Sequence, residues 1–150
     1  MPNILADNAA ASAVPQTRIR ANKQHGRIRI FESTVTVAAG TLVGETITWG
    51  QLPVGARVLG NMGLLSFSTG AASSTLNVGD AAAPARHLAA TAVTTAGTAI
   101  PQAQSLAGAS FQTSDNSTAA TNNCTLISVV AGATLATAQV ITLRLPFALD

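Results

Sequence analysis

The sequence is poor in charged side chains. They make up 9% of the 150 residues, whereas they make up about a quarter of an ordinary globular protein. Because charge normally covers the surface of a soluble monomer, we expect this chain to bury much of its surface against other chains. The alternative is a monomeric β domain, rich in Thr and Ser, whose surface is polar but neutral. We favour association and expect a homo-oligomer, either a dimer or a trimer.

Cysteine, aromatic residues and long apolar runs are also scarce. The chain has one Cys, one Trp and no Tyr, so an intrachain disulfide is excluded, and we expect Cys124 to be a small buried side chain. No stretch approaches the ~20 apolar residues of a membrane span, and the first 20 residues lack the pattern of a signal peptide. We therefore expect no membrane partner and synthesis in a cytoplasm.

The residues that usually carry chemistry are few and scattered. The two histidines, His25 and His87, belong to no H-x-x-H spacing, and the single cysteine forms no C-x-x-C pair. The acidic residues occur singly, and neither a phosphate-binding loop nor a dinucleotide-binding motif is present. We expect no enzyme, no metal site and no cofactor. For His87 we expect a side chain at a strand edge that makes one hydrogen bond, rather than a catalytic group.

The positive charge is concentrated near the N-terminus. Five of the eight Lys and Arg residues lie between residues 18 and 29. Residues 1–26 have no hydrophobic period and are interrupted by Pro15, so we interpret them as an extended basic arm and residues 27–150 as one domain. An arm of this length could reach about 90 Å. Its cations could contact nucleic acid, but no aromatic residues are interleaved with them, and we favour contact with neighbouring protein subunits.

From residue 27 onward, short runs alternate between apolar and polar residues, which indicates half-buried strands. We predict strands at 27–31, 34–37, 45–49, 57–67, 74–78, 88–93, 109–113, 124–130 and 139–145, with Pro146 ending the last one. The run 57–67 is apolar on both faces, as in a central strand buried on both sides. About eight strands with turns every 8–12 residues predict an all-β fold, a single antiparallel β-sandwich of the jelly-roll type. The core residues that we predict are Trp49, Leu59, Leu64, Phe67, Leu76, Ile127, Val129, Ile141 and Leu143.

Two short motifs lie between these strands. Residues 52–58 read L-P-V-G-A-R-V, and residues 76–86 read L-N-V-G-D-A-A-A-P-A-R. Together they resemble small virion proteins of tailed bacteriophages, in which the second motif usually has Asp at the position of Asn77. The resemblance covers roughly the middle third of the chain and follows turns and strand ends. It implies a capsid decoration (cement) protein or another minor virion component, and it implies no chemistry.

On this resemblance we expect a structural protein on the capsid exterior, made in the host cytoplasm, that binds and stabilises the shell of the major capsid protein. We do not expect nucleic acid as a partner. The alternative is a phage tail or head-fibre component acting as a receptor- or carbohydrate-binding module, although sugar-binding surfaces generally need more aromatic residues. For Asp80 and Arg86, the alternative to a partner contact is an ion pair that closes their loop. The partner-binding residues that we predict are Ile4, Leu5, Arg18, Ile19, Arg20, Lys23, Arg27, Arg29, Asp80 and Arg86.

Overall fold

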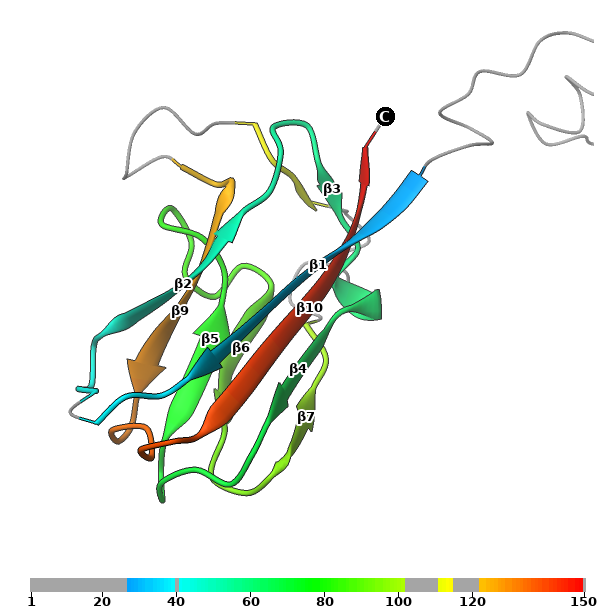
Figure 1. Ribbon diagram of the computed structural model, residues 1–150. Helices are drawn as coiled ribbons and strands as arrows, with labels where there is room; N and C mark the ends of the chain where they lie inside the picture. The colour runs from blue at the N-terminus through cyan, green and yellow to red at the C-terminus, as the bar shows by residue number, and fades with distance from the viewer. Residues whose placement is uncertain (1–26, 40, 102–110, 115–121, 150) are drawn as a thin grey trace, which may run out of the picture.

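The computed structural model describes residues 27–39, 41–101, 111–114 and 122–149, which form two antiparallel sheets (Figure 1). The larger sheet contains β1 (Arg27–Thr36), β3 (Arg57–Val58), β4 (Leu64–Phe67), β7 (Gly97–Ala99), β8 (Phe111–Gln112) and β10 (Val140–Leu149). The smaller sheet contains β2 (Thr46–Gln51), β5 (Thr75–Val78), β6 (Leu88–Ala92) and β9 (Thr125–Ala131). A single 3₁₀ turn, η1 (Gly60–Met62), separates β3 from β4.

The order of the strands confirms the predicted jelly-roll sandwich. The larger sheet runs β1-β10-β4-β7, and β3 and β8 extend it alongside the second half of β10. The smaller sheet runs β2-β9-β5-β6. Counting β3 and β4 as one interrupted strand and setting aside the short β8, each sheet has four main strands, and the chain changes sheet at most connections. This is the jelly-roll arrangement of eight strands in two sheets.

Strand alternation places the core between the sheets. In β10, Ile141, Leu143 and Leu145 are fully buried, while the residues between them face outward. Leu76 of β5 is also fully buried, and Trp49 of β2 is 6% exposed. The predicted inward faces of these three strands are therefore confirmed, because in each one the apolar residues stand on a single face.

In β9, the prediction chose the wrong face. Leu126, Ser128 and Val130 are fully buried, whereas Ile127 and Val129 are only half-buried. The hydroxyl of Ser128 accepts a hydrogen bond of 2.8 Å from the indole nitrogen of Trp49, so both polar atoms are satisfied inside the core. Because both faces of β9 carry apolar residues, alternation alone did not identify this serine as an inward residue.

The run 57–67 is not one long strand, and this prediction was also wrong. The amide of Met62 donates to the carbonyl of Leu59, and the amide of Gly63 donates to the carbonyl of Gly60, which closes the turn η1 in its middle. A Cβ atom on Gly63 would stand 3.0 Å from the Leu145 side chain and 3.2 Å from the Arg144 carbonyl. Leu59, and Leu64 in β4, are half-buried instead of belonging to the fully buried core.

Strand β10 continues through Pro146 to Leu149, although we expected it to end at Pro146. The Pro146 carbonyl accepts a hydrogen bond from the amide of Leu59, so this side of Pro146 faces the break between β3 and β4. A proline nitrogen cannot donate a hydrogen bond, and at this break no strand requires a donor. The whole of β10 pairs with β1, which is continuous where we expected two strands. A further difference is β7, because residues 97–99 belong to none of the strands predicted from the sequence.

Candidate interaction surfaces

The first residues of β1 are the most exposed part of the larger sheet. They pair with the end of β10, so the start of β1 and the end of the described chain lie side by side (Figure 1). Arg27 and Arg29, both predicted to bind a partner, are exposed, and so are Ile28 at 55% and Ile30 at 65%. Charged and apolar side chains therefore alternate here with little cover. The other predicted partner-binding residues before position 27 lie outside the described residues: Ile4, Leu5, Arg18, Ile19, Arg20 and Lys23.

Farther along the same face of β1, polar side chains pair with β10. Arg144 donates a 2.7 Å hydrogen bond to the exposed Glu32 carboxylate, which raises the pKa of Arg144. Two residues farther along the pairing, the hydroxyls of Thr34 and Thr142 are 2.8 Å apart. This part of the surface satisfies its own charges, in contrast to the start of β1.

Asp80 and Arg86 close their own loop between β5 and β6. Asp80 is fully buried, and both its oxygens are engaged: one accepts from the amide of Ala83 at 2.9 Å, and Arg86 donates to both. The guanidinium of Arg86 lies 4.1 Å from the centroid of the Phe111 ring. The structure thus supports the alternative of a loop-closing ion pair, since Asp80 has no surface to offer. Contact between Arg86 and a partner stays a prediction.

His87 directly precedes β6, the strand at one edge of the smaller sheet, but the expected side-chain hydrogen bond is not found among the described residues. It is buried, its ring meets Phe111 edge-on at 5.7 Å, and its Nε2 atom has no hydrogen-bond partner. Burial lowers the pKa of His87 from 6.5 to about 4; the charge of Asp80 raises it and that of Arg86 lowers it further. The ring is therefore neutral at neutral pH and occupies the core as an apolar group would.

The two motifs found in the sequence make hydrogen bonds that fix the backbone around them. In the first, the amide of Ala56 donates to the Thr113 hydroxyl, which itself donates to the carbonyl of Pro53. In the second, the Asn77 side-chain oxygen accepts from the amide of Val129 at 2.7 Å, at an irregular point in strand pairing. An Asp at position 77 would also supply an oxygen acceptor. These motifs determine local structure, and neither one assembles a reactive site.

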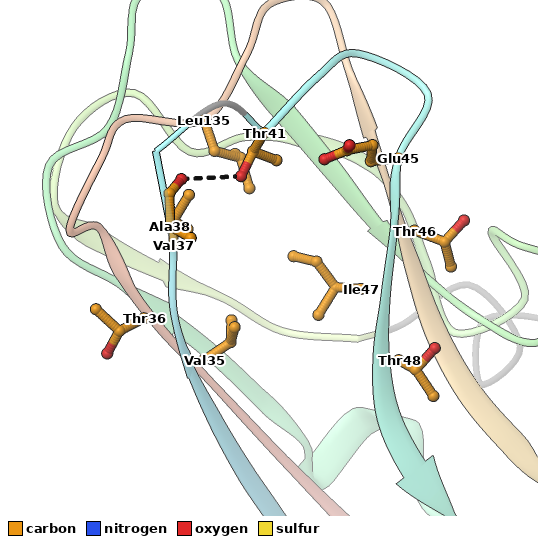
Figure 2. Close-up of a pocket in the computed structure, with 10 residues that line it drawn as sticks. All are labelled: Val35, Thr36, Val37, Ala38, Thr41, Glu45, Thr46, Ile47, Thr48 and Leu135. Atoms are coloured by element: carbon orange, nitrogen blue, oxygen red, sulfur yellow. Dashed lines mark hydrogen bonds between the residues drawn. The ribbon is translucent and has the colours of Figure 1, made fainter.

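A groove of about 320 Å³ opens between β1 and β2, at the edge of the sandwich (Figure 2). Its apolar walls are Val35 and Val37 from one sheet, Ile47 from the other, and Leu135 at one end. Figure 2 shows the side chain of Ile47 pointing into the space between the two strands. Glu45 lines the same groove and is exposed. No sequence pattern indicates this groove, because its walls come from two sheets whose relative position only the fold determines.

Among the described residues, no group of three or more His, Cys, Asp or Glu side chains is suited to hold a metal ion. Within the same ranges, no helix is long and apolar enough to cross a membrane. Cys124 is buried, as expected.

No protein-family model matches the sequence, and a search of curated proteins finds no match either. Two solved structures have a similar fold. One is a chain of the cyanophage Pam1 capsid asymmetric unit, with a TM-score of 0.64 and 23% identity over 93% of this chain and 99% of that chain. The other is a chain of the Ralstonia phage GP4 capsid, with a TM-score of 0.62 and 19% identity over 83% of this chain and 86% of that chain.

Both similar structures are bacteriophage capsids, which bears out the resemblance to phage virion proteins at the level of the fold. At these identities the likeness shows a shared fold. The match with the Pam1 chain runs through nearly all of both chains, so the two are also close in length.

Proposed function

We propose that this chain is a structural virion protein of a tailed bacteriophage, and specifically a capsid decoration (cement) protein that binds the major capsid protein and stabilises its shell. The observation that carries the proposal is the fold match with a capsid chain along almost the full length of both chains. The match covers nearly the whole of a chain from a capsid, and not only a part of that chain. Under this proposal the protein is a homo-oligomer on the capsid exterior.

The surface of the described residues supports an assembly role. Exposed large apolar side chains occur on several elements, and few charges accompany them. Such surfaces in soluble proteins commonly mark sites of protein association. The largest exposed fractions belong to Ile28, Ile30, Leu42, Val43, Val54 and Met62. With arginines beside the first two, the start of β1 combines apolar area and positive charge, and we propose it as part of the contact with the shell.

The alternative of a carbohydrate-binding module receives no support from the aromatic residues. All five of them, four Phe and one Trp, belong to the described part of the chain, and none is exposed. Trp49, the one residue that could offer a large stacking surface, is buried and bonded to Ser128. A sugar ring would therefore find no exposed aromatic face in the structure.

The proposal is tested by the protein's copy number in purified particles. A decoration protein is expected at a copy number near that of the capsid protein, and a fibre or tail module at only a few copies per particle. Adding the purified protein to shells that lack it should raise their thermal disruption temperature. If it is absent from intact particles, or has no effect on the shell's stability, the decoration role is wrong.

Two further measurements test the finer parts of the proposal. Limited proteolysis of intact particles should cleave the protein before the capsid protein if it lies on the exterior. Sedimentation of the isolated protein should give a dimer or a trimer. A stable monomer at micromolar concentration and physiological salt would contradict the expected self-association.

A further inference from the structure

The groove between β1 and β2 lies between two unpaired sheet edges. In the described part of the chain, β1 pairs only with β10, and β2 pairs only with β9. Each strand therefore presents a row of backbone donors and acceptors toward the groove side. An exposed sheet edge of this kind can receive an extended segment as an added strand, while a neighbouring pocket accepts its side chain.

We propose that the groove binds residues 18–20 of a neighbouring copy of this chain, with Ile19 between Val35 and Ile47. These residues read Arg-Ile-Arg, one apolar side chain flanked by two cations. The walls of the groove are apolar, and Glu45 is the only charged residue among the described ones that line it. Glu45 forms no ion pair with any described cation, so it is available to an arginine of the incoming segment.

The length of the chain favours a neighbouring copy over the same chain. β1 begins at Arg27, and the groove lies at its far end, at Val35 and Val37. If residues before 27 folded back along β1 through a turn of two residues, the shortest common hairpin loop, Ile19 would stand opposite Glu32. Three more residues of β1, about 10 Å of strand, separate that position from Val35. Ile19 of the same chain would therefore miss the groove, whereas Ile19 of a second copy is under no such constraint.

Disulfide trapping tests the proposal with the full-length protein. The double variant Ile19→Cys/Ile47→Cys should form covalent dimers and larger species under mild oxidation, because a disulfide requires Cα atoms within about 7 Å. Each single variant should give only background dimer, and Cys124 is too buried to compete. A matched control places the second cysteine at Thr98, which is exposed on β7 away from the groove. If Ile47→Cys impairs folding, Val35→Cys on the opposite wall replaces it.

The outcomes separate the possible occupants. Cross-linked species that remain monomeric would show that the groove binds its own chain, and this would overturn the proposal. Equal yields with the Thr98 control, or no cross-link with either wall, would also overturn it. Glu45→Gln removes the charge but keeps an oxygen that can accept the hydrogen bond from the Leu42 amide. This substitution should lower the yield of covalent dimer and make that yield less dependent on salt. Since only copies of this chain are used, the result does not depend on the proposed capsid partner.

Discussion

The loop between β5 and β6 and the start of β1 both carry arginines. The arginine of the loop is paired within the chain, whereas those at the start of β1 are exposed. In the loop, the fully buried Asp80 forms an ion pair with the half-buried Arg86, and Phe111 lies against the guanidinium. At the start of β1, Arg27 and Arg29 are exposed and form no ion pair with the described residues. A charge that is buried and paired within the chain stabilises its fold, whereas exposed charges contribute little to folding and remain available for assembly.

This difference predicts which substitutions affect folding and which affect association. Removing one member of a buried ion pair leaves the other charge without compensation. Changing an exposed charge alters long-range attraction but leaves the packing of the core intact.

Asp80→Ala should lower the free energy of unfolding by about 3–5 kcal/mol, because Arg86 would lose its partner and the Ala83 amide its acceptor. Urea denaturation of the purified protein measures the change. The matched control is Glu32→Ala, which removes the exposed partner of Arg144 and should change the unfolding midpoint far less. Equal effects at the two positions would contradict the distinction between buried and exposed ion pairs.

The burial of His87 predicts a loss of stability in acid. Its pKa is about 4 in the folded state, below the ordinary 6.5, so the unfolded chain binds more protons between these two pH values. The stability contributed by the neutral ring is complete above about pH 6.5 and is lost as pH falls toward about 4. The loss is up to about 3 kcal/mol. His87→Phe keeps a ring against Phe111 and should reduce this pH dependence, as measured by denaturation across the range. An unchanged profile would show that other groups are responsible.

After deletion of residues 2–26 the protein should keep its β-sheet circular dichroism signal and a thermal transition, because we interpret this segment as an arm outside the sandwich. Binding to particles should weaken, and what remains should depend less on salt, since five of the chain's cations lie between residues 18 and 29 and three of these are removed. Particle binding is measured by co-sedimentation. Unchanged affinity would remove the arm from the mechanism, and loss of the thermal transition would make it part of the folded core.

The double variant Arg27→Glu/Arg29→Glu should have the smallest effect. Both side chains are exposed, so the unfolding midpoint should stay close to that of the wild type. Affinity for particles should fall by roughly tenfold or less, since single exposed ion pairs contribute little. The charge-neutral variant Arg27→Gln/Arg29→Gln separates loss of attraction from new repulsion. A large drop in stability would show that these arginines belong to the fold.

The general fold could be predicted from the sequence because alternation was clear in the strands whose polar and apolar residues separate cleanly, such as β5 and β10. Prediction from alternation failed in β9 and in the run 57–67, because both faces of these segments carry apolar residues. In such strands the face that points inward depends on contacts with other strands. In β9, for example, the inward Ser128 accepts a hydrogen bond from Trp49. The prediction of partner-binding residues was limited in a similar way. Asp80 was included among them because the sequence does not show how deeply a side chain is buried.

By itself, the sequence determined an all-β chain with a basic N-terminal segment, because strand periodicity and charge are properties of neighbouring residues. Only the tertiary structure decided where Pro146 and the buried His87 could be accommodated. The proline lies opposite the break between β3 and β4, and the histidine lies against Phe111, a residue from a distant part of the chain. The groove between β1 and β2 likewise exists only because two sheets meet along edges that no other described strand pairs with. Such features depend on contacts between segments far apart in the sequence, and local patterns do not encode them.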